Sequence, residues 1–512
     1  MESLLRPAGT QPVRLAALVE ALDLLGDPAG AEPVTGITLD SRAVRPGWIY
    51  VALPGSRAHG AQFAGSAVEA GAVAVLTDGD GAARLPGLAV PVLVAADPRA
   101  AAGVLAARVF GDPATHMTMF GVTGTNGKTT TVALLQAGLL AAGRLPGTIG
   151  TIGFRLGSEE IRSARSTVTT PEAPDLQGLL GVMLERGADA VALEVSSHAL
   201  ALRRVDGITF DVAAFLNLGR DHLDFHADLE DYFEAKARLF EPGRARVSVI
   251  WTDDPRGRVL AERIRAHGRS RLVTVGTDEA ADYRLDSYRE VAPLGGHGVV
   301  VRRGERVDLP LALPGRYNMI DAVVALAMLE AADVPTGAAL AGLAVAQVPG
   351  RMERVALPDG APLTVVDFAH TPQAVEAAVG SLSAAGPVIT VLGCGGDRDP
   401  AKRPDMGAAA ARGSELVIIT DDNPRSEDPA AIRAAAVAGA SAAGGAEVIE
   451  VAGRARAIEE ALRRADGSNV VAILGKGHER GQILADRTVD FDDMAETRAA
   501  WARLHREGDA DA

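Results

Sequence analysis

The stretch Gly121-Val122-Thr123-Gly124-Thr125-Asn126-Gly127-Lys128-Thr129-Thr130 decides the fold of the middle of this chain. It follows an apolar run at 117–120 that is typical of a strand and precedes an apolar run at 131–142 that predicts a helix. Such a turn holds a polyphosphate, because its backbone N–H groups face the anion, the lysine adds a point charge and a threonine hydroxyl can ligate Mg²⁺. The sequence therefore predicts an ATP site. Its residues are Gly124, Thr125, Asn126, Gly127, Lys128, Thr129 and Thr130.

The glycine spacing departs from the general phosphate-loop pattern. That pattern has its first glycine at position 122, where this chain has valine, and the glycines fall instead at 121, 124 and 127. The spacing resembles that of the Mur ligase and folylpolyglutamate synthetase superfamily more than that of GTPases or transport ATPases. A turn that merely joins strand to helix is the alternative, which Lys128 and Thr129 disfavour.

Length and hydropathy indicate a multidomain globular protein. The chain has 512 residues, 47% of them hydrophobic, and a mean hydropathy of +0.12, so it can bury a large core and should divide into about three domains. The longest apolar run near Asp321, at 322–329, is too short to cross a bilayer, and residues 1–7 lack the apolar core of a signal peptide. We expect a cytoplasmic protein without membrane insertion.

The single cysteine and the net charge exclude several kinds of site. Cys394 is alone, which rules out an internal disulfide framework and a cysteine metal cluster, and the carboxylate of Asp397 nearby would not stabilise a thiolate. The net charge of -15 and the aromatic content of 4% argue against a nucleic-acid partner. We expect small-molecule substrates and a monomer.

Alanine-rich helical stretches alternate with short Val/Ile/Leu runs, a pattern that predicts the α/β class with parallel sheets. Turn-forming residues at 111–113 and 348–350 indicate breaks in this pattern. We predict three domains, at 1–112, 113–348 and 349–512.

Polar side chains follow the predicted strands, and ligands of open α/β sheets bind beyond the carboxyl ends of strands. The second domain has predicted strands at 190–195, 212–217 and 247–251. Its candidates for one cleft are Glu194, Ser196, His198, Asn217, Asp221 and His222. The third domain has predicted strands at 364–366, 388–392, 416–420 and 470–474, followed by polar segments at 367–370, 393–398, 421–425 and 475–479.

Glu194 ends an apolar run, where a carboxylate is costly unless it is paired or bound to a metal. Mg²⁺ prefers oxygen ligands, which Thr129, Glu194 and ATP would supply; pairing of Glu194 with a surface arginine is the alternative. The segment 215–226 adds two histidines and two aspartates. Zinc fits that composition, but the phosphate loop and the lack of a nearby cysteine favour magnesium with phosphate.

Further motifs, in order along nearly the whole chain, resemble those of the Mur ligase family. They are Leu39-Asp40-Ser41-Arg42, the GTNGKT loop, Thr169-Thr170-Pro171-Glu172, EVSSHAL at 194–200, NLGRDHLD at 217–224, Lys236 in EAKARLF at 234–240, Arg316-Tyr317-Asn318, Gly350-Arg351-Met352-Glu353, the run 367–372, GCGGDRD at 393–399, Asp422-Asn423-Pro424-Arg425 and Gly475-Lys476-Gly477-His478-Glu479. Their co-occurrence in this order is highly specific.

The resemblance implies ATP-dependent amide bond formation in cytoplasmic peptidoglycan precursor synthesis. The γ-phosphate would pass to the free carboxylate of UDP-N-acetylmuramoyl-L-alanyl-D-glutamate, and the amine of meso-2,6-diaminopimelate would attack the resulting acyl phosphate. Domain 1–112 would bind the UDP-substrate, domain 113–348 would be the P-loop, parallel-sheet ATPase domain, and domain 349–512 would be Rossmann-like and bind the amino acid. Because ATP and the carboxylate are both anions, cationic groups must neutralise them.

The resemblance also implies roles for residues. Lys236 would be carbamylated by CO₂ and become an anionic ligand of a second Mg²⁺ beside His222, whereas the residues alone would indicate an ordinary surface lysine. The implied catalytic residues are Lys128, Glu194, His222 and Lys236, and the implied metal ligands are Thr129, Glu194, His222 and carboxylated Lys236.

Binding residues carry over from the family in the same way. Further ATP contacts would be Asn318, Arg351 and Asp367. The UDP-substrate contacts would be Leu39, Ser41, Ser56, Arg57, Ala58, Thr169, Thr170, Ser196 and Arg204. The diaminopimelate contacts would be Arg398, Asp422, Asn423, Pro424, Arg425, Gly475 and Glu479, whose arginines and carboxylates suit a substrate that is zwitterionic at both ends.

Three positions depart from the family pattern. Val168 and Leu202 stand where an Asn and a Gln often contact the UDP-substrate, and Asp321 stands where a second Asn often follows Asn318. The first two weaken single contacts, and the third leaves the hydrogen bonding to the nucleotide open. None removes a charge needed for catalysis.

Three other functions compete with this interpretation. The lysine-adding form of the same ligase is disfavoured because L-lysine has no distal carboxylate for Arg425 to hold. A folylpolyglutamate synthetase-like ligase is the second alternative. The third is a nucleotide-dependent switch or scaffold without ligase activity, but Lys128, Glu194, His222 and Lys236 are all present.

Overall fold

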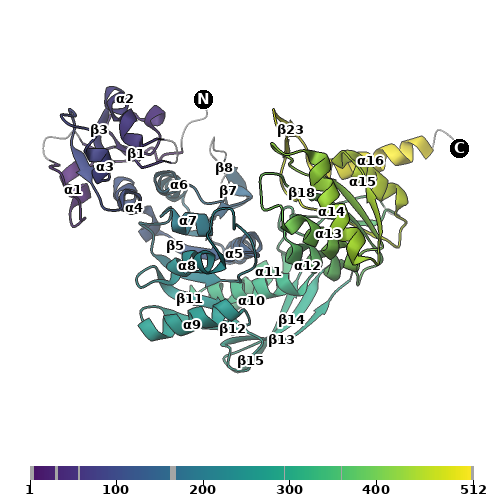
Figure 1. Cartoon of the computed structure of the whole chain (residues 1–512). Coiled ribbons are helices and arrows are strands. Elements are labelled where there is room, and N and C mark those ends of the chain that lie inside the picture. Colours follow the sequence, from purple (N-terminus) through teal and green to yellow (C-terminus); the bar gives the residue numbers. More distant parts are fainter. Residues whose placement is uncertain are drawn as a thin grey trace.

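The computed structural model describes residues 5–28, 33–55, 58–161, 169–292, 294–358 and 360–508. Within these residues, sheets of four, eleven and six strands follow one another along the chain, and helices pack beside them (Figure 1). The α/β class predicted from the sequence is confirmed. None of the helices described combines the length and the apolar character needed to traverse a bilayer.

The first sheet is fully parallel, in the order β1-β2-β3-β4. Its core contains Ile37, Ile49, Leu76 and Leu105, the last on the helix that leads into the second sheet. The strands are β1 (Gly36–Thr38), β2 (Trp48–Val51), β3 (Ala72–Thr77) and β4 (Val92–Val94), and the helices are α1 (Leu15–Val19), α2 (Ala64–Glu69), α3 (Gly79–Ala82) and α4 (Pro98–Val109).

The second sheet is mixed, in the order β15-β14-β13-β12-β11-β10-β5-β9-β6-β7-β8. Its strands are β5 (Thr118–Thr123), β6 (Pro146–Gly150), β7 (Gly153–Leu156), β8 (Glu159–Ile161), β9 (Ala190–Glu194), β10 (Phe210–Phe215), β11 (Ala245–Trp251), β12 (Arg271–Gly276), β13 (Tyr283–Glu290), β14 (Gly296–Arg302) and β15 (Glu305–Leu311). Within this order the strands β13-β12-β11-β10-β5-β9-β6 are parallel, but both ends of the sheet are antiparallel, which the sequence pattern did not predict. The antiparallel strands follow one another through short turns, which need no crossover helix.

Two apolar clusters cover the two faces of this sheet. One joins the sheet to α5 (Lys128–Ala141), α10 (Arg316–Ala331) and α11 (Thr336–Val345). The other is formed with α6 (Ala173–Glu185), α7 (Ser197–Ala201), α8 (Leu229–Ala237) and α9 (Pro255–His267). Helix α5 begins three residues before the predicted run, directly after Gly127.

The third sheet has the order β16-β17-β21-β18-β19-β20 and is parallel except for β16. All four strands predicted in this part of the chain are confirmed. The strands are β16 (Glu353–Arg354), β17 (Leu363–Asp367), β18 (Val388–Cys394), β19 (Leu416–Asp421), β20 (Glu447–Glu450) and β21 (Val470–Leu474), with a separate hairpin of β22 (Gly481–Ile483) and β23 (Thr488–Asp490). The helices are α12 (Pro372–Leu382), α13 (Lys402–Gly413), α14 (Pro429–Ala443), α15 (Arg454–Arg464) and α16 (Asp493–Gly508).

Polar contacts hold the third sheet's part of the chain against the second. The Nε2 atom of His478 is 3.2 Å from the carbonyl oxygen of Thr151, and Arg220 pairs with Asp399 at 3.7 Å. The breaks at 111–113 and 348–350 lie between successive sheets, but the exact domain boundaries 112/113 and 348/349 remain predictions.

Candidate functional site

A cavity of about 510 Å³ lies between the second and third sheets, beyond the carboxyl ends of their strands. The second sheet's part of the chain supplies one wall, which we call the central wall. The third sheet's part supplies the other, which we call the third wall after its sheet. Twenty-two of the residues predicted from the sequence line the cavity: Thr125, Asn126, Gly127, Lys128, Thr129, Thr130, Thr169, Glu194, Ser196, Asn217, Asp221, His222, Lys236, Asn318, Arg351, Asp367, Arg398, Asp422, Asn423, Arg425, Gly475 and Glu479.

The remaining predicted residues do not line this cavity. Gly124, Thr170 and Pro424 are sequence neighbours of residues that do, and His198 packs against His222, which does. Arg204 instead donates hydrogen bonds to Glu172 Oε1 and to the carbonyl oxygen of Thr170. Leu39, Ser41 and Ala58 belong to the first sheet's part of the chain, and Ser56, Arg57 and Val168 lie outside the described residues.

The phosphate loop has the backbone that an anion site needs. Gly127 precedes α5 with a φ of 88°, and a Cβ atom there would lie 2.4 Å from Oδ1 of Asp321, so only glycine fits. The loop is held by Asn217, which accepts hydrogen bonds from the backbone N–H groups of Thr125 and Asn126 at 3.0 and 2.9 Å. The first N–H groups of a helix have no partner within the helix, so those of α5 are available to phosphate oxygens.

Two lysines, the half-buried Lys128 and the buried Lys236, share one carbonyl oxygen at this loop. Lys128 Nζ donates to Gly124 O at 2.8 Å and to Thr125 O at 2.9 Å, and Lys236 Nζ donates to Gly124 O at 2.9 Å. Burial lowers the pKa of Lys128, and burial together with the charge of Lys128 brings the pKa of Lys236 well below its usual value. Lys236 is 1% exposed, so its interpretation as an ordinary surface lysine is wrong.

Glu194 ends β9 beside the loop and is 1% exposed. Its carboxylate accepts hydrogen bonds of 2.9 Å from the hydroxyls of Thr129 and Thr151 and from the backbone N–H of Thr151. Its charge is therefore held by hydroxyl and amide donors. A carboxylate and a threonine hydroxyl at a phosphate loop form a donor set that fits Mg²⁺.

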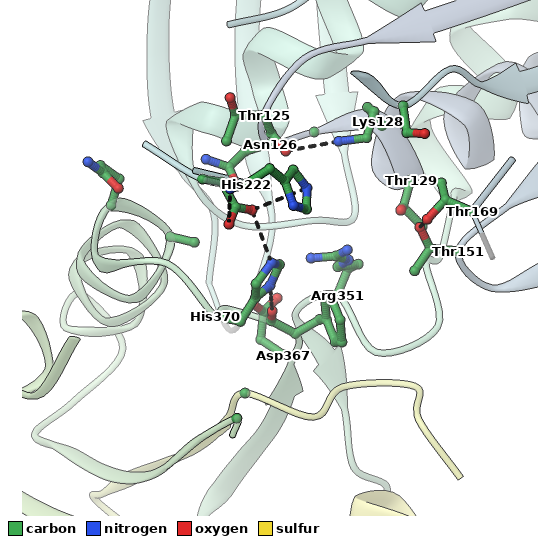
Figure 2. Close-up of a pocket in the computed structure, with 18 of the residues that line it drawn as sticks. Thr125, Asn126, Lys128, Thr129, Thr151, Thr169, His222, Arg351, Asp367 and His370 are labelled. Atoms are coloured by element: carbon green, nitrogen blue, oxygen red, sulfur yellow. Dashed lines mark hydrogen bonds and ion pairs between the residues drawn. The ribbon is translucent and has the colours of Figure 1, made fainter. Parts of the chain in front are cut away.

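Asp221 lies among His222 and two side chains from the third sheet's part of the chain, His370 and Lys402; Figure 2 labels the two histidines. Asp221 Oδ2 lies 3.6 Å from His222 Nε2 and 3.8 Å from His370 Nε2, and Asp221 Oδ1 lies 3.7 Å from Lys402 Nζ. Burial raises the pKa of Asp221, but the nearby His370, His222 and Lys402 outweigh burial and hold that pKa far below its usual value. Burial lowers the pKa of His222 to about 4, so its ring is neutral at neutral pH and has a lone pair for a ligand.

A second hydrogen-bond chain fixes the loop that carries His222. His226 Nε2 is 3.0 Å from Ser197 Oγ, and His226 Nδ1 is 3.2 Å from Asp231 Oδ2. The chain thus joins the first residue of α7 to the first turn of α8. His198 packs edge-on against the ring of His222, with 4.8 Å between ring centroids.

The predicted adenosine and phosphate contacts line the same cavity. Asp367 Oδ2 accepts a hydrogen bond of 2.7 Å from the backbone N–H of Met352, and the Arg351 guanidinium lies over the Phe368 ring (Figure 2 labels Arg351 and Asp367). Asp321 is buried, and burial raises its pKa well above its usual value. The raised pKa favours the protonated carboxyl group, which can donate a hydrogen bond as the amide of asparagine does.

The third sheet supplies a wall of mixed charge. Asn423 Nδ2 donates to Glu479 Oε2 at 2.7 Å, and Arg425 Nη1 donates to the carbonyl oxygen of Gly396 at 2.6 Å. Lys476, which is 0% exposed, lies 3.6 Å from Asp422 and 3.4 Å from Glu479. Cys394 is buried at the end of β18, and burial raises its pKa to about 12, which agrees with an inert thiol.

Sequence reasoning assigned no role to several residues of the site, including Thr151, Tyr232, Lys402 and Lys476. Lys476 lies in a motif quoted above, so the motif itself was the available signal. Thr151 and Tyr232 carry no such signal, because their positions follow from the ends of β6 and α8 in the fold.

Three family models together match most of the chain. "Mur ligase family, catalytic domain" matches residues 33–110, "Mur ligase middle domain" matches 122–329, and "Mur ligase, glutamate ligase domain" matches 350–477. The chain is 47% identical to the UDP-N-acetylmuramoyl-L-alanyl-D-glutamate--2,6-diaminopimelate ligase of Streptomyces coelicolor, over 96% of this chain and 98% of the relative. It is 42% identical to the UDP-N-acetylmuramyl-tripeptide synthetase of Leifsonia xyli subsp. xyli, over 97% and 98%.

Solved structures agree with these sequence relatives. A UDP-N-acetylmuramoyl-L-alanyl-D-glutamate--2,6-diaminopimelate ligase structure is 31% identical, with a TM-score of 0.70 over 97% of this chain and 100% of the other. A Mycobacterium tuberculosis folylpolyglutamate synthase complexed with ADP is 20% identical, with a TM-score of 0.59 over 79% of this chain and 93% of the other. The second likeness concerns the fold alone.

Proposed function

The chain belongs to the Mur ligase family, and from that premise we propose that it adds meso-2,6-diaminopimelate to UDP-N-acetylmuramoyl-L-alanyl-D-glutamate with ATP. The product would be an amide formed in the cytoplasmic synthesis of peptidoglycan precursors. One observation carries this proposal: a single cavity joins the phosphate loop to the wall of arginines and carboxylates predicted to bind the amino acid. Near full-length similarity to diaminopimelate ligases supports it.

The central wall would bring ATP and the substrate carboxylate together. Backbone N–H groups of the loop and Lys128 bind the phosphates, while Arg351 and Asn318 hold the nucleotide. A carboxylate oxygen of the D-glutamyl residue then bonds to the γ-phosphorus as the bond to ADP breaks. The amine attacks the acyl carbon, and phosphate leaves. The protein contributes chiefly position and positive charge.

Magnesium and a carbamate complete this proposal. Thr129, Glu194, His222 and carboxylated Lys236 would hold Mg²⁺, which would neutralise phosphate charge. The lowered pKa of Lys236 supports carbamylation, because only the neutral amine reacts with CO₂. The carbamate would also replace one of two adjacent ammonium groups with an anion, which relieves repulsion with Lys128.

The third wall would select the amino acid. Arg398 and Arg425 suit its carboxylates, while Asp422 and Glu479 suit its ammonium groups, with Asn423, Pro424 and Gly475 shaping the site. The UDP-substrate would extend toward the first sheet and Leu39, Ser41, Ser56, Arg57 and Ala58, past Thr169, Thr170, Ser196 and Arg204. We propose a monomer with domains 1–112, 113–348 and 349–512.

The lysine-adding reaction is the second candidate, because the name of the Leifsonia relative leaves the amino acid open. The test is phosphate release and product mass with ATP, UDP-N-acetylmuramoyl-dipeptide and either amino acid. We expect a tripeptide with diaminopimelate and none with lysine. Turnover with lysine alone would overturn the amino-acid assignment, and ATP hydrolysis without tripeptide would overturn the ligase assignment.

A further inference from the structure

Lysine is rare in this chain and is confined to the site. Of the 51 basic residues, four are lysines: Lys128, Lys236, Lys402 and Lys476. Three of them line the main cavity, and the fourth contacts Asp422 and Glu479 in its wall. Arginine fills the other basic positions, including exposed ion pairs such as Arg463 with Glu459. Lysine thus occurs in this chain only at the site, where a compact ammonium group and a planar guanidinium group would bind a ligand differently.

Lys402 is the one cavity-lining lysine that the proposed mechanism leaves without a role. It is the first residue of α13, and its side chain is 14% exposed. The adjacent Arg403 behaves differently, because its guanidinium forms hydrogen bonds of 2.9 and 2.7 Å with the two carboxylate oxygens of Glu427. Two neighbouring cations on one helix therefore have different contacts. Arg403 forms an ion pair with Glu427, and Lys402 lines the cavity.

The ammonium of Lys402 has spare capacity to bind an anion. Its Nζ is 3.7 Å from Asp221 Oδ1, which is too long for a hydrogen bond, and no other acceptor is within hydrogen-bonding distance among the described residues. Asp221 already has two histidine partners. Lys402 thus brings a positive charge from the third sheet's part of the chain to Asp221, in the cavity that the phosphate loop also lines.

We propose that Lys402 is a catalytic residue that contacts the phosphoryl group during its transfer to the carboxylate. This rests on the proposed function. As the carboxylate–phosphorus bond forms and the bond to ADP breaks, negative charge spreads over the equatorial phosphoryl oxygens, and no proton need move. Lys402 neutralises that charge as a point charge among crowded oxygens. Because it belongs to the third domain, phosphoryl transfer then depends on that domain being closed on the central wall.

The test separates phosphoryl transfer from amine attack. Enzyme, ATP and UDP-N-acetylmuramoyl-dipeptide are mixed with hydroxylamine, which traps the acyl phosphate as a hydroxamate, or with diaminopimelate, which gives the amide. Lys402→Met and Lys402→Arg should each lower both products by roughly 100-fold, while ATP affinity changes by less than about twofold. Arg412→Lys, an exposed exchange on the same helix, is the matched control and should stay within about twofold of the parent.

Two outcomes of the product assays would overturn the role of Lys402. One is full activity of Lys402→Arg, because a guanidinium would then serve equally. The other is loss of amide with hydroxamate retained, which would place Lys402 at the amino acid instead of the phosphoryl group. Weakened ATP binding or a lowered unfolding temperature in both variants would show a structural role and reject the proposal. Failure of the parent enzyme to form tripeptide would instead reject the proposed function.

Discussion

The two walls of the cavity treat charge in opposite ways. On the central wall, the charged ends of Glu194, Lys128 and Lys236 form hydrogen bonds with hydroxyls and carbonyl oxygens. On the third wall, Asp422 and Glu479 lie within 3.6 and 3.4 Å of Lys476. A wall of buried charges held by neutral groups is prepared for charges that a ligand brings, whereas a wall of mixed charge suits a zwitterion.

The largest expected effect comes from removing a charge of the central wall. Lys236→Ala should abolish turnover, a loss of roughly 10³-fold or more, because the proposed carbamate ligand cannot form. ATP binding should be largely kept, since Lys128 and the loop remain. Added acetate should restore part of the rate by supplying a carboxylate in the vacated space. Phosphate release and calorimetric ATP binding measure this, and full activity of the variant would remove Lys236 from the mechanism.

The third wall should give a smaller and more selective effect. Arg425→Met should raise the KM for diaminopimelate by roughly 100-fold, because a charge-assisted contact to a carboxylate is lost. The KM values for ATP and the UDP-substrate should stay the same. Arg480→Met, at an exposed position of the same part of the chain, is the matched control and should change nothing. Equal loss of affinity for all three substrates would contradict a dedicated amino-acid wall.

The contact between the two walls, where His478 lies beside Thr151, should make the free energy of unfolding depend on pH. Burial, followed by the charge of Arg351, lowers the pKa of His478 to about 4 from 6.5. Between these pH values the unfolded chain binds a proton that the folded chain does not, so the free energy of unfolding falls as pH falls from 6.5 to about 4. His222 acts in the same sense. His478→Gln should flatten this dependence in denaturant titrations followed by circular dichroism, and parallel curves for the two proteins would contradict the assignment.

The smallest effect is expected at the family departure beside the loop. Asp321→Asn exchanges a buried carboxyl, whose pKa burial raises, for a neutral group of the same shape. Turnover should change by less than about threefold, because both forms offer a hydrogen-bond donor and acceptor. Steady-state kinetics at saturating ATP measure this. A loss beyond about tenfold would show that the ionised carboxylate is needed.

The sequence predicted the third domain's strands and the phosphate loop well, because apolar runs that end in polar residues mark buried parallel strands. It did not predict the antiparallel ends of the second sheet, since β13 to β15 alternate exposed and buried residues and form no continuous apolar run. The start of α5 was misplaced because Lys128 and three threonines interrupt the apolar pattern, although they form its first turn.

Within the site, the residues of linear motifs were predictable, but their pairings were not. Asp221 and Lys402 are 181 positions apart, and nothing local in either segment indicates that they approach within 3.7 Å. The same holds for Thr151, which binds Glu194 through a hydroxyl whose placement depends on β6 lying beside β9. The role of each predicted residue remains a prediction for the experiments above.

The central claim is that the carboxylate is activated by phosphoryl transfer within this cavity. The most direct measurement uses UDP-substrate labelled with ¹⁸O in the D-glutamyl carboxylate, with ATP and diaminopimelate, and mass analysis of the released phosphate. The account predicts that one labelled oxygen passes into phosphate for each tripeptide formed. Tripeptide formation with unlabelled phosphate would contradict it.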